Sequence, residues 1–399
     1  MLLDLCLISL PNPVLANPTM YFPLGILYIA AVVKEAGYNV GIVDMRDGLK
    51  DVPDAHFYGF SCTTPEVTYA RSLMRQLDGK TIIGGAHPSL APDDCKDFDY
   101  VVVGEGEVAI LAVLGGIKTQ LVMSPSRLQE LDNIPYPAWD MVERPFSEEL
   151  FPGERYGKGE LGATLIASRG CNFNCSFCGN VYRKPTVFRS IENIIGELKE
   201  LQKRGVYYFR FEDDNFTTHP QFADLCLKLN GLGIKYKCHT RSRLLTLGKA
   251  RLLKWSGCEE MSVGVESGDQ DVLDINHKQE SVEHHLQAVS NIREARMRAK
   301  TYLIAGLPGE TGASVERTKD FIRQSKPDKW TLSTFTPYPG CDVYRRPKEY
   351  GVEILDWDYS KWWNFCEDSF VHRLEGQTQE EMWQRYLELY EWLKNETWK

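Results

Sequence analysis

The chain has 399 residues, of which 43% are hydrophobic and 25% charged, and its formal net charge is −9. This length predicts two or three folded domains, and the acidic balance disfavours non-specific nucleic-acid binding. The apolar run at residues 26–33 is too short to span a bilayer, and the first residues do not resemble a signal peptide. We therefore expect a cytoplasmic α/β protein without a membrane partner and with nucleic acid as an unlikely partner.

The first part of the chain alternates between strand-like and helix-like segments. Strands are expected at residues 3–9, 40–43, 57–61, 81–84 and 100–103, with helices at 24–36 and 66–77. This alternation predicts a doubly wound, Rossmann-like parallel sheet over residues 1–115. Such sheets bind ligands at the carboxyl ends of their strands. The turns Gly84-Gly-Ala-His-Pro88 and Gly104-Glu-Gly-Glu107 fall there.

A second series of strands and helices follows a less regular connector, residues 116–160. Strands are expected at residues 163–168, 207–211, 236–239, 260–265, 300–305 and 330–334. Six strand–helix repeats predict a partial (β/α)₆ barrel over residues 161–341. Residues 342–399 are rich in aromatic and charged side chains and are expected to form an extension with a short helix at residues 379–394.

Three of the eleven cysteines are clustered directly after the first strand of this second series, at Cys171, Cys175 and Cys178. Structural zinc normally has four protein ligands, so here a fourth would have to come from a distant histidine or cysteine. A [4Fe–4S] cluster held by three thiolates would instead leave one iron open to a small-molecule ligand. The spacing alone leaves both alternatives open.

The Cys-x₃-Cys-x₂-Cys spacing, with Phe177 before the last cysteine, resembles the radical S-adenosylmethionine (SAM) superfamily. The resemblance implies that the three cysteines hold a [4Fe–4S] cluster whose open iron chelates the amino and carboxylate groups of SAM. One-electron reduction would then cleave SAM to a 5′-deoxyadenosyl radical, with the protein positioning the cofactor. It also implies an electron donor such as flavodoxin or ferredoxin.

Further motifs carry this resemblance through residues 160–345. They are Phe211-Glu-Asp-Asp-Asn-Phe-Thr217, Cys238-His-Thr-Arg241, Gly264-Val-Glu-Ser-Gly268, Ile304-Ala-Gly-Leu-Pro-Gly-Glu310 and Phe335-Thr-Pro-Tyr-Pro-Gly340. By resemblance, the SAM-binding residues are Phe177, Asp213, Asp214, Asn215, Arg241, Glu266, Ser267, Lys278 and Leu307. Two alternatives stay open. The acidic turn at residues 213–215 is also typical of a helix N-cap, and Lys278 would alternatively be a solvent-exposed residue of a helix.

The N-terminal domain resembles the cobalamin-binding domain of one large subfamily of these enzymes. The matching stretches include Phe22-Pro-Leu-Gly-Ile-Leu-Tyr28, Gly59-Phe-Ser-Cys-Thr-Thr64 and Ile134-Pro-Tyr-Pro-Ala-Trp-Asp140. Glycines at strand ends let the backbone approach a large flat tetrapyrrole closely. The implied cobalamin-binding residues are Ser61, Thr63, Gly84, Gly85, His87, Gly104, Glu105 and Gly106. The Asp-x-His-x-x-Gly motif of cobalamin-dependent mutases is absent, so we expect no histidine below the cobalt.

These resemblances imply a radical SAM enzyme, most directly a cobalamin-dependent methyltransferase acting on an unactivated carbon, or on phosphorus, of a small molecule. Radical rearrangement, oxidation or ring formation without methyl transfer, with or without cobalamin, is the first alternative. A non-catalytic iron–sulfur or zinc module is the alternative from another class. The subfamily that modifies tRNA is disfavoured, because its N-terminal cysteine triad has no counterpart here.

The aromatic residues of the C-terminal extension allow two interpretations. They are Trp357, Tyr359, Trp362, Trp363 and Phe365. They would form either a wall of the substrate site or a hydrophobic cluster that closes the barrel.

Overall fold

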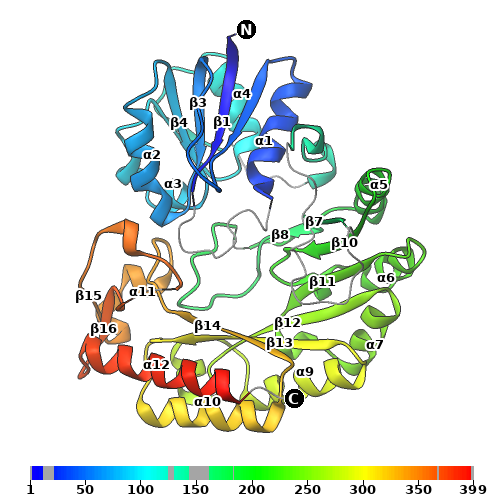
Figure 1. Ribbon diagram of the computed structural model, residues 1–399, viewed down its shortest axis with the longest axis vertical. Coiled ribbons are helices and arrows are strands. Elements are labelled where there is room, and N and C mark those ends of the chain that lie inside the picture. Colours follow the sequence, from blue (N-terminus) through cyan, green and yellow to red (C-terminus); the bar gives the residue numbers. More distant parts are fainter. Residues whose placement is uncertain are drawn as a thin grey trace.

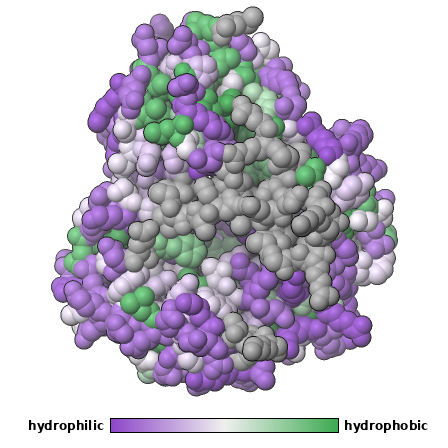
Figure 2. Space-filling model, in the orientation of Figure 1, coloured by the Kyte–Doolittle hydropathy of each residue, from purple (hydrophilic) through white to green (hydrophobic). Residues whose placement is uncertain are grey.

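The computed structural model describes residues 2–11, 22–124, 130–142, 161–182, 184–365 and 368–396. An N-terminal α/β domain lies above a curled parallel sheet, and the C-terminal extension runs along the outside of that sheet (Figure 1). In the view of Figure 2, hydrophobic residues gather mainly over the N-terminal domain. Within the described ranges, no helix combines the length and apolar character that crossing a membrane would require.

The N-terminal sheet is parallel, with strand order β2-β1-β3-β4-β5-β6. Its strands are β1 (Leu3–Ser9), β2 (Val40–Asp44), β3 (Ala55–Ser61), β4 (Lys80–Gly84), β5 (Tyr100–Val103) and β6 (Leu121–Met123). These strands are short apolar runs because helices cover both faces of the sheet. The predicted Rossmann-like sheet is confirmed, and β6 extends it beyond the expected boundary at residue 115 into the expected connector.

Four helices accompany this sheet: α1 (Leu24–Glu35), α2 (Val67–Met74), α3 (Ala86–Leu90) and α4 (Gly106–Leu114). Buried side chains of α1 and α4 share one apolar cluster with the sheet. Residues of α2 belong to a separate cluster that includes other faces of the same strands. Helix α1 ends at Glu35, and Gly37 shortly after it has a φ of 87°, a conformation that suits glycine after a helix.

The second sheet is also parallel, with strand order β14-β13-β12-β11-β10-β7. Its strands are β7 (Leu161–Leu165), β10 (Val206–Phe211), β11 (Lys235–Thr240), β12 (Cys258–Glu266), β13 (Arg298–Ala305) and β14 (Lys329–Thr334). Helices α5 (Ile191–Gln202), α6 (Phe222–Asn230), α7 (Leu247–Trp255), α8 (Gln270–Ile275), α9 (Val282–Glu294) and α10 (Gly312–Ser325) connect them. The predicted six-stranded partial barrel is confirmed, with β7 and β14 at the edges of the curled sheet.

The cysteine-bearing segment forms a loop between two short antiparallel strands, β8 (Ser168–Arg169) and β9 (Val187–Phe188). Backbone hydrogen bonds tie this loop to the barrel rim, because Ser176 donates to the carbonyl of Asn276 and accepts from the amide of Val343. We call residues 170–182 the cluster loop. Its position is therefore determined by both the strand pair and the barrel.

The C-terminal extension begins with α11 (Asp342–Arg345), continues through the antiparallel pair β15 (Val352–Ile354) and β16 (His372–Leu374), and ends in α12 (Gln379–Asn395). The predicted C-terminal helix is confirmed, and α12 packs against α10 on the outside of the barrel. The side-chain amide of Gln377 donates to the carbonyl of Glu310, at 2.7 Å. The extension is thus attached to the turn at residues 306–310, which follows β13.

Glu310 gives a pH-dependent prediction for stability. Burial raises the pKa of this carboxyl to about 7, although the backbone of Gly306 and the charge of Arg385 favour the ionised form. Because the pKa is higher in the folded state than in the unfolded chain, the folded state binds the proton more tightly. The free energy of unfolding therefore falls by about 3 kcal/mol as the pH rises from about 4.5 to about 7.

We expect Glu310→Gln to remove this part of the pH dependence, measured as urea unfolding at pH 5 and pH 8. Glu316→Gln is the matched control, because Glu316 lies on α10 with its side chain 60% exposed. A Glu310→Gln protein that loses as much stability as the wild type between these two pH values would contradict the prediction.

Candidate active site

The three clustered cysteines are partly withdrawn from solvent, and polar side chains are directed at their sulfur atoms. Cys175 is buried, while Cys171 and Cys178 are half-buried. Arg241 donates from Nη1 to Cys175 Sγ at 3.1 Å, and Asn215 donates from Nδ2 to Cys171 Sγ at 3.4 Å. Such N–H donors stabilise the negative sulfur atoms of iron–sulfur clusters.

A single metal ion fits this geometry poorly. Among the described residues, no group of three or more His, Cys, Asp or Glu side chains is placed to hold one ion. Thiolates arranged around a cluster are farther apart than the ligands of one zinc ion, which are each within about 2.3 Å of the metal. That the three cysteines hold a [4Fe–4S] cluster remains a prediction, with which the N–H donors at their sulfur atoms agree.

The acidic turn after β10 divides into one structural and one accessible carboxylate. Asp213 is buried and accepts hydrogen bonds from the backbone N–H of Ala167, at 3.0 Å, and from the hydroxyl of Ser168. Burial raises the pKa of Asp213 to about 6 despite these bonds. Asp214 is exposed and accepts a hydrogen bond from Asn180 Nδ2 at 2.9 Å. Asp213 therefore anchors the start of the cluster loop, and contact with SAM remains a prediction best suited to Asp214.

Lys278 lies in a buried network of charges rather than in solvent, so the solvated-helix alternative is wrong. Its Nζ is 2.7 Å from Glu266 Oε1 and 3.6 Å from Glu280 Oε2. Arg241 Nη2 is 3.5 Å from the same oxygen of Glu280. Burial alone would lower the pKa of Lys278, but the two carboxylates outweigh it and raise that pKa. The ammonium group is therefore charged within the site.

Glu266 reaches this network through an unusual backbone conformation. Its φ is 64°, and the pairing of β12 with β13 shifts between Gly264 and Glu266. A Cβ at position 264 would lie 2.4 Å from Glu266 Oε1 and 3.1 Å from Lys278 Nζ. Glycine at 264 therefore leaves room for the ion pair, and the left-handed residue at the strand end is of the kind found at functional sites.

The remaining predicted SAM residues lie around the same rim. Leu307 is buried at 1% exposure, and Phe177 packs against the barrel core from the cluster loop. The hydroxyl of Ser267 accepts a hydrogen bond from the backbone N–H of Asp269 at 3.2 Å. These positions are compatible with an apolar contact for Leu307 and Phe177 and with a turn-forming role for Ser267.

A cavity of about 310 Å³ lies between the carboxyl ends of the N-terminal strands and the cluster loop. Five of its lining residues belong to the predicted cobalamin site: Ser61, Gly84, Gly85, Gly104 and Gly106. Gly85 has φ 101°, and a Cβ there would lie 2.8 Å from the backbone N of Cys62. Glycine is thus required at that turn, and the backbone is exposed to the cavity. A glycine-rich rim with largely apolar walls fits a flat tetrapyrrole. We call this space the cobalamin cavity.

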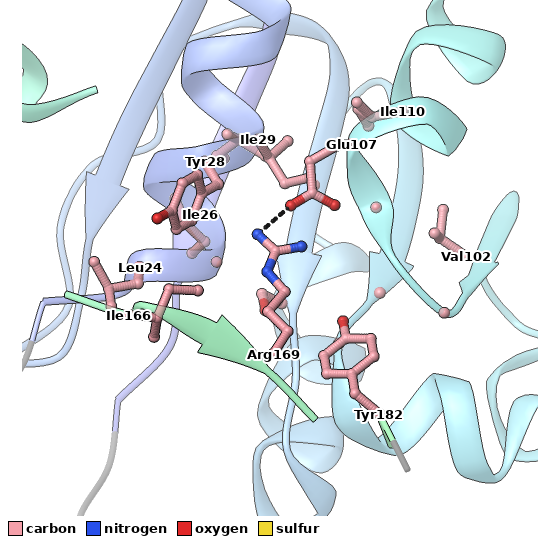
Figure 3. A pocket seen from close by; sticks show the side chains of 18 of the residues that line it. Leu24, Ile26, Tyr28, Ile29, Val102, Glu107, Ile110, Ile166, Arg169 and Tyr182 are labelled. Carbon is pink, nitrogen blue, oxygen red and sulfur yellow. Dashed lines mark ion pairs between the residues drawn. The ribbon is translucent and has the colours of Figure 1, made fainter. Parts of the chain in front are cut away.

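Arg169 projects into the cobalamin cavity and joins the two domains (Figure 3). Its guanidinium is 2.7 Å from Glu107 Oε1, 3.5 Å from Glu105 Oε1, and over the ring of Tyr28. Burial would lower the pKa of Arg169, but Glu107 raises it above its ordinary value. We did not predict Arg169 or Glu107, although one directly precedes Gly170-Cys171 and the other ends a quoted glycine turn. Glu280 was also missed, and no sequence pattern distinguishes it.

Three predicted cobalamin residues lie outside the described lining of the cobalamin cavity. Thr63 lines a second cavity, and Glu105 is buried in the ion pair with Arg169. His87 is buried, with Nδ1 3.2 Å from Thr64 Oγ1 and its ring 5.0 Å from that of Tyr359. Burial lowers the pKa of His87 to about 4, so its imidazole is neutral at pH 7. For these three residues, cobalamin contact remains a prediction.

Comparisons with protein families agree with this arrangement. Residues 165–322 match the model of the radical SAM superfamily, and residues 18–114 match the B12 binding domain. The first range covers the cluster loop and most barrel strands, and the second covers the glycine turns of the N-terminal sheet. The two matches together account for both sides of the cobalamin cavity.

Among curated proteins, an uncharacterized methyltransferase of Pyrococcus horikoshii is 28% identical over 364 residues, which is 81% of this chain and 77% of that protein. The bacteriochlorophyllide d C-12(1)-methyltransferase of Chlorobaculum tepidum is also 28% identical, and the match covers 84% of this chain and 75% of that protein. The solved structure of the radical SAM methyltransferase TsrM from Kitasatospora setae, with cobalamin and a [4Fe–4S] cluster bound, has the same fold. Its TM-score is 0.70 at 14% identity, covering 97% of this chain and 89% of that one. The chain therefore combines the radical SAM and B12 binding domains that cobalamin-dependent radical SAM enzymes share, a combination that implies a [4Fe–4S] cluster, SAM and cobalamin as cofactors.

Proposed function

We propose that this enzyme transfers a methyl group to an unactivated carbon, or to phosphorus, of a small molecule. The observation that carries the proposal is the shared lining of the cobalamin cavity. Arg169 and Gly170, next to the first cluster cysteine, line it together with Gly84 and Gly104 of the N-terminal domain. When bound, the cluster and SAM supply radical chemistry and cobalamin carries the methyl group.

The names of related proteins support methyl transfer, in one relative at a carbon position and in another on a phosphonate compound. The bacteriochlorophyllide relative is named for methylation at a carbon position. A relative from Streptomyces wedmorensis, 26% identical with 82% of this chain and 78% of that protein covered, is named a cytidylyl-2-hydroxyethylphosphonate methyltransferase. These names describe those proteins, and they favour the methyl-transfer alternative for this one.

The charged residues of the site suit SAM. Lys278 and Arg241 are cations that would pair with the methionine carboxylate, and Asp214 would accept from its amino group. The N–H groups that Arg241 and Asn215 direct at the cysteine sulfurs would stabilise the additional negative charge of a reduced cluster.

Reduction requires an electron donor, for which we propose a small redox protein such as flavodoxin or ferredoxin. None of the described cysteines forms a disulfide bond. This is consistent with a reducing cytoplasm, where thiols and low-potential donors persist.

The test is anaerobic reconstitution with iron, sulfide and hydroxocobalamin, followed by desalting and measurement of cobalt and iron per chain. We expect about one cobalt and about four irons. With SAM and reductant, we expect both 5′-deoxyadenosine and S-adenosylhomocysteine, the product left when SAM loses its methyl group. Iron without cobalt, or 5′-deoxyadenosine without S-adenosylhomocysteine, would contradict methyl transfer through cobalamin.

A cavity-filling variant sharpens this test. A Cβ at Gly84 would make ordinary contacts with Val102, at 3.6 Å, so Gly84→Val is expected to fold. Its side chain would occupy part of the cobalamin cavity, so bound cobalt should fall at least about tenfold while iron is unchanged. Gly312→Val is the control, because nothing lies within 4 Å of an added Cβ there.

A further inference from the structure

A second cavity, of about 610 Å³, lies where the cluster loop, the N-terminal domain and the C-terminal extension meet. Cys178 lines it from the cluster loop and Thr64 from the N-terminal domain. Tyr182 and Asp214 line both this cavity and the cobalamin cavity. A molecule held here would therefore lie beside the cluster and beside cobalamin at the same time. We call this space the side cavity.

One wall of the side cavity is aromatic. It consists of Tyr338, Trp363 and Phe365. The phenol of Tyr338 donates to the carbonyl of Trp362, and the indole N–H of Trp363 donates to that of Ser360, both at 2.8 Å. Because these polar atoms are already bonded, the rings offer the cavity apolar surface. Phe365 remains 38% exposed, which is unusual for a large apolar side chain in a concave site.

This aromatic wall is held in place before any ligand arrives. The backbone N–H of Thr334 donates to the carbonyl of Asn364 at 2.7 Å, and the hydroxyl of Thr336 donates to that of Trp363 at 2.9 Å. Both contacts attach the wall to the end of β14. A preformed wall binds flat rings without the entropic cost of ordering the side chains first.

The polar side chains around the side cavity are bonded to one another. Thr64 Oγ1 pairs with His87 Nδ1 at 3.2 Å, and Asn180 Nδ2 donates to Asp214 Oδ2 at 2.9 Å. Asn180 Oδ1 accepts from the backbone N–H of Tyr182 at 2.7 Å. Among the described residues that line this cavity there is no Lys, Arg or His, and Asp214 is the one carboxylate. The electrostatic character of this lining is therefore negative.

We propose that the side cavity binds the methyl acceptor, and that the acceptor presents a flat apolar or aromatic group that is neutral or cationic, not anionic. This inference rests on the proposed function, since the acceptor has to lie beside both cofactors. A ring would stack on Trp363 and Phe365. An ammonium or N–H group would pair with Asp214, whose two carboxylate oxygens can accept from both SAM and the acceptor. A carboxylate or phosphate would instead face Asp214 and the cluster thiolates without a compensating cation among the described lining residues.

Three probes that share the indole ring system but differ in charge test the inference: tryptamine, indole and indole-3-acetate. Their binding to the reconstituted holoenzyme is measured by equilibrium dialysis. We expect tryptamine to bind most tightly and indole-3-acetate at least about tenfold more weakly than indole. No binding of tryptamine, or equal binding of indole-3-acetate, would overturn the proposal.

Variants of the wall locate the binding. Phe365→Ala and Trp363→Ala should each weaken tryptamine binding about five- to tenfold, as expected for loss of one aromatic partner. Trp357→Ala is the matched control, because Trp357 belongs to the same extension, is 58% exposed and does not line the side cavity. Phe365→Ala is the variant with the least risk to folding, and unchanged binding by it would contradict the proposed location.

The same preparations separate this inference from the proposed function. Suppose that the protein binds tryptamine more tightly than indole-3-acetate in a manner that depends on Phe365, yet binds no cobalt and forms no S-adenosylhomocysteine. That result would uphold the side cavity as a binding site and reject methyl transfer. Normal cobalt binding and S-adenosylhomocysteine formation, together with unchanged tryptamine binding by Phe365→Ala, would uphold methyl transfer and reject the side cavity as the binding site.

Discussion

Cys175→Ala is expected to abolish SAM cleavage, with 5′-deoxyadenosine falling to the level of a protein-free control. Cys175 is 7% exposed, lies between the other two cluster cysteines in the chain, and accepts the hydrogen bond from Arg241. Its loss would leave two thiolates, too few for a stable [4Fe–4S] cluster. The effect should therefore exceed the roughly 10- to 100-fold that follows loss of an outer-shell partner. Iron content, absorbance near about 400 nm and product formation measure it.

Cys341→Ser is the control for this prediction. Cys341 is also buried, but its Sγ accepts a hydrogen bond from the backbone N–H of Tyr344 at 3.3 Å, at the start of α11. A serine hydroxyl accepts the same bond, so this variant should keep iron and activity. SAM cleavage retained by Cys175→Ala would reject the cluster assignment, as would iron loss by a folded Cys341→Ser protein.

Lys278→Met should lower the free energy of unfolding by about 3 kcal/mol, because it leaves two buried carboxylates without this cation. Those carboxylates belong to Glu266 and Glu280, which are 9% and 3% exposed. Adding Glu266→Gln should restore part of the loss, since it removes one of the uncompensated charges. Urea unfolding of the single and double variants under anaerobic conditions measures the coupling.

A surface lysine provides the comparison for Lys278. Lys254 is 2.9 Å from Glu259 Oε2, and its side chain is 34% exposed. Lys254→Met should therefore cost less than about 1 kcal/mol. Two results would contradict the prediction that the buried network stabilises the fold. One is that Lys278→Met is no more destabilising than Lys254→Met, and the other is that adding Glu266→Gln to Lys278→Met lowers the free energy of unfolding further.

Much of the fold could be predicted from residue patterns alone. Buried parallel strands are short, nearly continuous apolar runs, and for this reason the expected strands at residues 3–9 and 100–103 coincide with β1 and β5. The expected C-terminal helix at residues 379–394 likewise lies within α12. The strand β6 was missed, because three residues, Leu121–Met123, are too few to establish a period.

The sequence by itself determined which segments of the chain carry the cofactor chemistry, although the cysteine spacing alone left zinc and a [4Fe–4S] cluster both open. Thiols three and two residues apart, and glycines where strands end, limit which cofactors fit, because spacing and the missing side chain are local properties of the chain.

Only the tertiary structure decided which charges are buried together. Arg169 meets Glu107 across the two domains, and Lys278, in the segment between α8 and α9, pairs with Glu266 at the end of β12. The tertiary structure also showed that Asp213 is bonded to Ala167 and Ser168, just before the cluster loop. The physical reason is that the burial and pairing of a charged side chain depend on side chains from distant segments. A local sequence pattern does not indicate which segments will come into contact.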